Sequence, residues 1–175
     1  MSYINNKDTD RDYTGFDQAI SKLQRNISDQ FPFIKVYHRA YLFREKDVKG
    51  RVIKVPKIWE EIREYINVLP SDFKEAMAFF YPTSDEYIKE FDREQSINNL
   101  YERDICVILW LNTEKLEDHN TGPSLSEIKG DLLKVLSNSD IVIQVNSICD
   151  NDAEQIFREF TIRDEDTQYL MLPYS

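Results

Sequence analysis

The chain has 175 residues, of which 41% are hydrophobic and 13% aromatic, and its formal net charge is −10. This length and composition favour one folded domain with a packed core and exclude wholesale disorder. The negative net charge argues against a protein that binds nucleic acid by neutralising its phosphates. It does not exclude a surface that DNA slides past.

The N-terminal part predicts a polar arm followed by a helix. Residues 1–12 are polar and are assigned to the arm, whereas residues 13–175 are expected to form the single domain. Thr14 is suited to cap a helix. Apolar residues then recur at helical spacing over residues 14–30, at Phe16, Ala19, Ile20, Leu23 and Ile27. This spacing predicts an amphipathic helix.

A long β-hairpin is predicted over residues 33–55. The segment 33–45 carries large side chains at both sets of alternating positions, which is typical of a strand whose two faces are both covered. The chain turns at Lys49-Gly50 and returns as a second strand, which Pro56 closes. The hairpin is therefore expected to protrude from the domain as an arm.

The middle of the chain predicts strands and irregular segments. Residues 57–70 combine helical spacing in their first half with strand composition in their second, so we expect a short helical turn and then a strand. A strand is predicted near residues 77–81, and a loop with a short helix over residues 82–100. The next strand, 104–112, contains seven consecutive apolar residues and is expected to be buried on both faces.

The C-terminal part predicts a capped helix and further alternating elements. Ser124 and Glu127 form an S-x-x-E capping box before an apolar stripe of helical period. A strand is predicted over residues 141–148, a helix over 150–160 and a last strand over 168–173. The element order predicts an α+β fold with a mixed, mainly antiparallel sheet, two or three packed helices and the long protruding β-hairpin.

No residue pattern indicates a catalytic, cofactor or metal site. The four glycines form no phosphate-binding motif. The acidic run DTDRD, residues 8–12, has the opening spacing of a calcium loop but lacks the glycine and the glutamate that such a loop requires. His38 has the chemistry of a general base, yet a hydrogen-bonded histidine in a sheet is commoner. We therefore predict that the chain is not an enzyme and binds no cofactor or metal.

The cysteines and the N-terminus indicate a soluble protein made in the cytoplasm. Cys106 and Cys149 lie in or beside predicted strands and belong to no CxxC pair, so both are expected to be reduced and buried. The N-terminus lacks the basic and apolar pattern of a signal sequence, and no apolar run is long enough to cross a membrane.

The order of elements, with LWLN at residues 109–112 and IVIQV at 141–145, resembles the tail-terminator and tail-completion proteins of tailed bacteriophages. The segments VPKIWEEIREYINVLPSDFKEAMAFFYP (55–82) and ERDICVILWLN (102–112) more particularly resemble short head–tail connector or tail-ring proteins of crAss-like phages, whose hosts are of the Bacteroides type. The resemblance covers most of the chain. It implies an α+β domain that forms a ring around the DNA channel between head and tail.

The resemblance also implies a location and partners. The chain is expected in the neck or tail of the virion, as a homo-oligomeric ring of six or twelve copies that meets other neck and tail proteins. DNA passes through the ring without specific binding, and no membrane is involved. The hairpin is nominated as the inter-subunit arm, with an oligomer interface formed by Tyr37, Arg39, Tyr41, Phe43 and Val52.

Two other functions remain open from the sequence. One is a monomeric adaptor or inhibitor that binds a single protein partner through the hairpin or an acidic face. The other is a small hydrolase that uses His38 or a pair of acids.

Overall fold

The computed structural model describes residues 15–46, 49–60, 64–68, 76–84, 87–90, 100–112, 124–139 and 143–148. Within these residues lie the helices α1 (Gly15–Gln30) and α3 (Leu125–Ser137). The strands are β1 (Lys35–Arg39), β2 (Tyr41–Lys46), β3 (Val52–Glu60), β4 (Glu64–Asn67), β5 (Ala76–Pro82), β6 (Tyr87–Glu90), β7 (Leu100–Glu102) and β8 (Ile105–Leu111).

The strands form three sheets, in the orders β1-β5-β8, β2-β3-β4 and β6-β7. Strand β1 runs parallel to β5, and the other pairings among the described strands are antiparallel. The first sheet is therefore mixed, and the second is antiparallel throughout. This arrangement confirms the predicted α+β class with a mainly antiparallel, mixed sheet.

Strand β5 is the centre of the core. It pairs with β1 on one side and β8 on the other, and every residue from Ala76 to Phe80 is buried. Its side chains alternate between two apolar clusters. Ala76, Ala78 and Phe80 belong to a first cluster with the helices, whereas Met77 and Phe79 belong to a second cluster on the opposite face.

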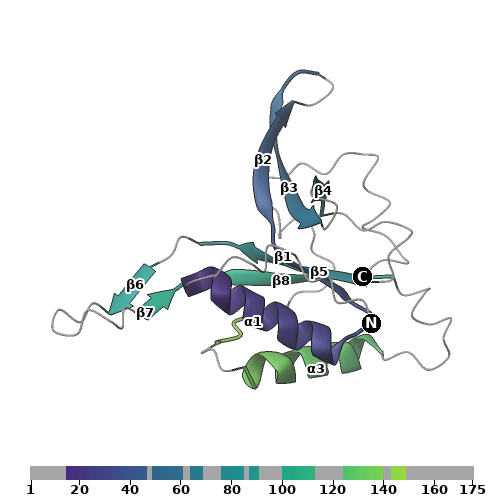
Figure 1. The fold of residues 1–175 in the computed structure, drawn as a ribbon, viewed down its shortest axis with the longest axis vertical. Coiled ribbons are helices and arrows are strands. Elements are labelled where there is room, and N and C mark those ends of the chain that lie inside the picture. Colours follow the sequence, from purple (N-terminus) through teal and green to yellow (C-terminus); the bar gives the residue numbers. More distant parts are fainter. Residues whose placement is uncertain are drawn as a thin grey trace.

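Helices α1 and α3 cover one face of the β1-β5-β8 sheet (Figure 1). Helix α1 buries Ile20, Leu23 and Ile27, and α3 buries Ile128 and Leu136. These residues have the spacing from which both helices were predicted, so the structure confirms both predictions. Neither helix combines the length and the apolar composition needed to cross a membrane, as far as the described residues go.

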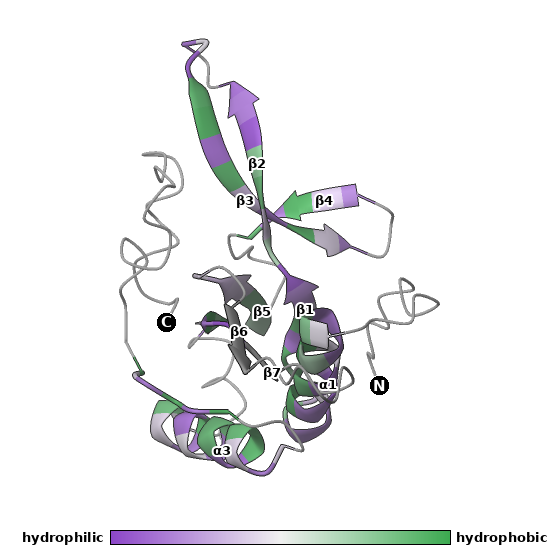
Figure 2. Ribbon diagram, turned by 90° about the vertical axis from the view of Figure 1, so that its left-hand side faces the viewer, coloured by the Kyte–Doolittle hydropathy of each residue, from purple (hydrophilic) through white to green (hydrophobic). Residues whose placement is uncertain are grey.

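The second sheet covers the opposite face of β1-β5-β8. Ile58 of β3 and Val68, just after β4, are completely buried there, together with Tyr37, Phe79 and Trp110 from the first sheet. The core therefore has three layers, with the helices outside, the β1-β5-β8 sheet in the middle and part of the β2-β3-β4 sheet on the other side (Figures 1 and 2).

The strand predicted over residues 33–45 is broken at Ala40 into β1 and β2, which lie in different sheets. The backbone N–H of Ala40 donates a hydrogen bond to the carbonyl of Phe80 at 2.7 Å, and the register of β1 on β5 shifts between Val36 and Arg39. The chain then leaves β5, and β2 pairs with β3 from Tyr41 opposite Lys57 to Lys46 opposite Val52. We call this paired segment, residues 41–46 and 52–57, the ribbon.

The prediction for residues 57–70 was wrong in its first half. Strand β3 continues to Glu60 instead of forming a helical turn, because Ile58 and Trp59 pair across to Ile66 and Tyr65 of β4. Large β-branched and aromatic side chains stabilise such cross-strand pairs, and this pairing outweighs the helical spacing of the isoleucines.

Two further sequence predictions differ from the structure. Residues 82–100 were expected to hold a loop and a short helix, but β6 and β7 pair there as antiparallel strands. Residues 143–148 form no strand; Val145 and Ile148 are exposed, and no strand among the described residues pairs with them. The predicted arm 1–12, helix 150–160 and strand 168–173 lie outside the described residues.

Strand β8 is less buried than its apolar sequence predicts. Ile108, Trp110 and Leu111 are buried, but the first three residues and Leu109 are half-buried. The strand lies at the end of the three-stranded order and has one strand neighbour, β5, in the described part of the chain. The strand buried along both faces is therefore β5, where Ala76 and Ala78 let the helices approach.

The capping box predicted for the second helix is present at the start of α3. The hydroxyl of Ser124 accepts a hydrogen bond from the backbone N–H of Glu127, and the Glu127 carboxylate accepts one from the backbone N–H of Ser124 at 2.7 Å. The hydrogen bonds from Ser124 hold the pKa of Glu127 below its ordinary value. This stabilisation is therefore present above the ordinary carboxylate pKa and is lost as the pH falls through the lowered value.

We expect Phe80→Ala to lower the free energy of unfolding by about 3–5 kcal/mol, because it removes a fully buried ring from the central strand and leaves a cavity. Urea unfolding measures this change. Leu125→Ala is the matched control, since Leu125 is 37% exposed and its truncation should cost about 1 kcal/mol or less. Equal losses for the two variants would contradict the central position of β5.

We expect Ser124→Ala to lower the free energy of unfolding by about 1 kcal/mol at neutral pH, because a helix N-cap is lost. The difference from the wild type should shrink in acid, where the Glu127 carboxylate becomes protonated. Ser126→Ala, within the same helical turn, is the control and should be neutral or slightly stabilising. Urea unfolding at neutral and acidic pH tests this, and a loss independent of pH would contradict the role given to Glu127.

Candidate functional site

The ribbon continues into an aromatic surface on one side of the β2-β3-β4 sheet. Tyr41 and Phe43 of β2, Trp59 of β3 and Tyr65 of β4 share this side, and we call these four residues the aromatic face. The Tyr65 ring is central to them. Its centroid lies 6.0 Å from that of Tyr41, 4.7 Å from that of Phe43 and 4.9 Å from that of Trp59. Such tilted and edge-on contacts hold the three strands together.

Two cations lie against the aromatic face, and each also meets a carboxylate. The guanidinium carbon of Arg39 is 4.7 Å from the Tyr41 ring centroid, and the side chain pairs with Asp17 at 3.2 Å. The ammonium of Lys57 is 5.8 Å from the Phe43 ring centroid and pairs with Glu45. The positive charges on this side are therefore largely compensated within the chain.

The five residues predicted as an oligomer interface fall in three different environments. Tyr37 is fully buried in the second apolar cluster, and its hydroxyl donates a hydrogen bond to Glu60 at 3.0 Å. It is part of the chain's own core and is not available on its surface. Arg39, Tyr41 and Phe43 lie at the aromatic face, whereas Val52 lies on the opposite side of the ribbon and is 66% exposed.

The opposite side of the ribbon carries basic residues and is exposed along β2 and at Val52, whereas Lys54 is half-buried and Pro56 is buried. Leu42, Arg44 and Lys46 are all exposed and alternate with the half-buried Phe43 and Glu45. Across from them on β3 lie Pro56, Lys54 and Val52. We call Leu42, Arg44, Lys46, Val52 and Lys54 the basic face.

Sequence analysis predicted a hairpin over residues 33–55, whereas the ribbon spans residues 41–46 and 52–57, and it missed the basic face. It considered apolar and aromatic residues at both sets of alternating positions and the charge of the whole chain. It did not sort the charges by face. The sequence signal for this face is the alternation of Leu42, Arg44 and Lys46 along one strand. Once the cross-strand register is known, these residues are seen to share a side with Val52 and Lys54.

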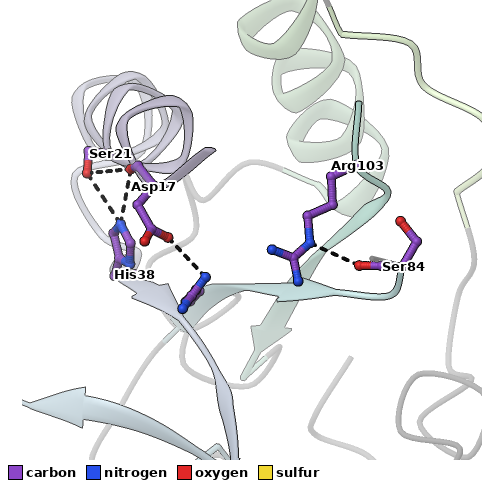
Figure 3. A network of polar contacts seen from close by, with 6 residues as sticks. Asp17, Ser21, His38, Ser84 and Arg103 are labelled. Carbon is purple, nitrogen blue, oxygen red and sulfur yellow. Dashed lines mark hydrogen bonds and ion pairs between the residues drawn. The ribbon is translucent and has the colours of Figure 1, made fainter. Parts of the chain in front are cut away.

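His38 takes part in a polar network between α1 and β1 (Figure 3). Its Nε2 atom lies 3.3 Å from the Ser21 hydroxyl oxygen and 3.4 Å from the Asp17 carbonyl oxygen. The Ser21 hydroxyl donates its hydrogen to the same carbonyl at 2.9 Å.

This geometry assigns His38 the role of a hydrogen-bond donor. A carbonyl oxygen can only accept, so the contact with Asp17 requires a hydrogen on Nε2 of His38. The Ser21 hydrogen is directed at Asp17, so Ser21 also accepts from Nε2. A general base would need a lone pair on Nε2 facing the serine hydrogen. The arrangement therefore orders the contact between α1 and β1 and does not activate Ser21.

Other polar contacts have the same structural role. The Gln24 amide donates to the Val36 carbonyl at 2.9 Å, which satisfies a backbone acceptor of β1, the strand at one end of the order β1-β5-β8. The Nε of Arg103 donates to the Ser84 carbonyl at 2.9 Å, and its guanidinium lies 4.8 Å from the Phe16 ring centroid. These contacts tie α1 and the ends of β5 and β8 to the core.

The described residues contain no group of three or more histidine, cysteine, aspartate or glutamate side chains that could hold a metal ion. Cys106 is a half-buried thiol that packs against the second apolar cluster. The acidic run at residues 8–12 and Cys149 lie outside the described residues.

Comparison with known proteins adds no relative, since no protein-family model, curated protein or solved structure matches this chain.

We expect Ser21→Ala to lower the free energy of unfolding by about 1 kcal/mol, because the hydroxyl that meets both Asp17 and His38 is lost. Ser28→Ala is the control, since Ser28 lies on the same helix outside this network. Urea unfolding measures both variants. An unchanged stability of Ser21→Ala would contradict the structural role given to the network.

Proposed function

We propose that the chain is a structural subunit of a bacteriophage neck or tail ring, a tail terminator or head–tail connector that oligomerises around the DNA channel. The observation that carries this proposal is the ribbon, which stands away from the helices and the β1-β5-β8 sheet (Figure 1). An isolated two-stranded ribbon is marginally stable in water. Contact with another protein surface would stabilise it.

The exposed apolar residues of the ribbon support the same conclusion. Leu42 and Val52 are 39% and 66% exposed, although both are large hydrophobic residues. Six residues of strand extend about 20 Å, which is enough to reach from one small domain onto the next. If each ribbon lies on the neighbouring subunit, the contact is head-to-tail, and a head-to-tail contact closes into a ring when its rotation allows.

The location and partners follow from this proposal. The chain belongs to the neck or tail of the virion and contacts other neck and tail proteins there. The overall negative charge lets DNA pass without specific binding, because a like-charged wall repels the phosphates. The hydrolase alternative gains no support from His38, whose Nε2 is a donor toward Ser21.

We expect the purified chain to form a closed homo-oligomer. Six copies of the 20.8 kDa chain weigh about 125 kDa and twelve weigh about 250 kDa. Light scattering behind size exclusion, over a range of concentrations, measures the mass. Electron microscopy of the largest species shows whether it surrounds an open channel.

A strict monomer at every concentration would contradict the ring and favour the adaptor that binds a single protein partner. A dimer or an open chain of variable length would contradict closure. Only a fixed mass with a visible central channel supports the proposed function.

A further inference from the structure

The two end strands of the β1-β5-β8 sheet differ in how their outer edges are covered. At β1, the Gln24 amide of α1 donates a hydrogen bond to the Val36 carbonyl, so a helix side chain satisfies that edge. At β8, the pairings within the described part of the chain involve β5 alone. A strand edge with unpaired backbone groups is a template for another strand.

The hydrogen bonds of β5 indicate which backbone groups of β8 face its outer edge. The Phe80 carbonyl accepts from Ala40, on the β1 side of β5. Successive residues of a strand turn their backbone groups to opposite sides, so those of Phe79 face β8, where Ile108 lies directly across. Ile108 therefore turns its own backbone groups toward β5. The residues of β8 whose backbone groups face outward are the alternate ones, Ile105, Val107, Leu109 and Leu111.

This outer edge lacks the features that usually keep other strands away from a sheet. Strand β8 contains no charged residue and no proline. Its pairing with β5 runs without a bulge from Ala76 opposite Leu111 to Pro82 opposite Ile105. Charges, prolines and bulges are the common protections of an edge strand. The outer edge of β8 is therefore suited to accept one more strand.

The same chain contains a strand-forming segment outside its three sheets. Residues 143–148, IQVNSI, carry no charge and include three β-branched residues, which favour strands. Ile143 packs against the first apolar cluster, and the segment lies close to α3 in both views (Figures 1 and 2). Beyond Ile143, Val145 and Ile148 are 41% and 52% exposed. The segment is thus anchored at one end, and its apolar side chains are displayed on the surface.

We propose that residues 143–148 of one copy add as a strand to the outer edge of β8 in a second copy. This inference rests on the proposed ring function and names a subunit contact besides the ribbon. A second copy is favoured because one chain supplies both halves of the contact, an open edge and a strand-forming segment, and both are uncharged. A different protein would satisfy only one of them.

The pairing would improve both partners. The outward-facing backbone groups of β8 would gain hydrogen-bond partners, which is how strand addition stabilises a complex. Every second side chain of the added strand would lie beside Val107 and Leu109, which are half-buried on the helix side of the sheet. Each copy would donate one strand and accept one. Such a head-to-tail contact closes into a ring when its rotation allows.

The β8 strand of the same chain is the alternative acceptor. Strand β8, helix α3 and residues 143–148 follow one another, an order that suits a right-handed crossover to a parallel strand. In the structure, Ile143 packs against the first cluster, and β8 and residues 143–148 of one chain are not paired with each other. The edge of β8 is therefore left to a neighbour.

The first test uses proline at two adjacent positions of the segment. Val145→Pro and Asn146→Pro each remove one backbone N–H. Because adjacent residues of a strand face opposite sides, one of the two N–H groups would face β8 and the other would face away. Val145→Thr and Asn146→Thr are the matched controls, since they keep the N–H and a β-branched side chain. Analytical ultracentrifugation gives the self-association constant of each full chain.

We expect one proline variant to associate roughly tenfold more weakly than the wild type or worse, because a hydrogen bond and the strand pairing are lost. The other proline variant should lose clearly less, and both threonine variants should stay within about threefold. Urea unfolding should be unchanged in all four. Association that survives both prolines, equal losses for the two prolines, or equal losses for the threonines would overturn the strand addition.

The second test locates the acceptor by photo-crosslinking. Ser147 is replaced by benzoylphenylalanine, and ¹⁴N-labelled and ¹⁵N-labelled chains are mixed before illumination. Mass spectrometry of the linked peptides should show residues 143–148 of one label joined to β8 of the other label. Links to β8 within one label only would assign the segment to its own sheet and overturn the second copy. Links to other elements, or none to β8, would overturn β8 as the acceptor.

The outcomes separate this inference from the ring. A closed ring that keeps its mass in both proline variants would contradict the strand addition and leave the ring in place. Dimers or open chains that one proline variant loses, with crosslinks between labels, would support the strand addition and contradict closure. A strictly monomeric wild type would overturn both.

Discussion

Strand β5 can bury both of its faces only because a different layer covers each of them. Phe80 points toward the helices and Phe79 toward β3, and neither side chain is exposed to solvent. The alanines at positions 76 and 78 are small enough to let α1 and α3 approach the sheet. The two layers must therefore form together, since removal of either would expose one row of β5 side chains to water.

This constraint also sets the direction of the ribbon. Strand β1 is fixed along β5 by parallel pairing and along α1 by the contacts of Gln24 and His38. The chain leaves that position at Ala40, whose N–H is held by the Phe80 carbonyl. The ribbon begins one residue later. Buried contacts of the core thus fix the point from which the ribbon starts.

The sequence predicted the elements whose signals are local. The 3.6-residue spacing of α1 and the capping box of α3 depend on neighbours within one or two turns, and both predictions are confirmed. The division of 33–45 between two sheets was missed because the large side chains continue past Ala40 without interruption. The strand conformation of residues 57–60 was missed because it depends on β4, which supplies the cross-strand partners of Ile58 and Trp59.

The candidate interface shows the same limit. Large side chains at both sets of alternating positions indicated that neither face of the hairpin is simply solvated. Which face becomes part of the core depends on what packs against it. Tyr37 precedes the break and is buried, whereas Val52 follows it and is largely exposed. Val36, Tyr37 and His38 are all buried in β1, whereas β3 begins exposed at Val52 and is first buried at Val55, so burial follows the layers that pack on each strand.

The two sides of the ribbon therefore differ in what they already contact. On the aromatic face, Tyr65 meets three rings and Lys57 pairs with Glu45, although Tyr41 and Tyr65 remain 36% and 40% exposed. The opposite side carries the exposed side chains of Leu42, Arg44, Lys46 and Val52. Cover increases along β3 from the exposed Val52 to the completely buried Ile58, because the inner end of the second sheet lies against the β1-β5-β8 sheet.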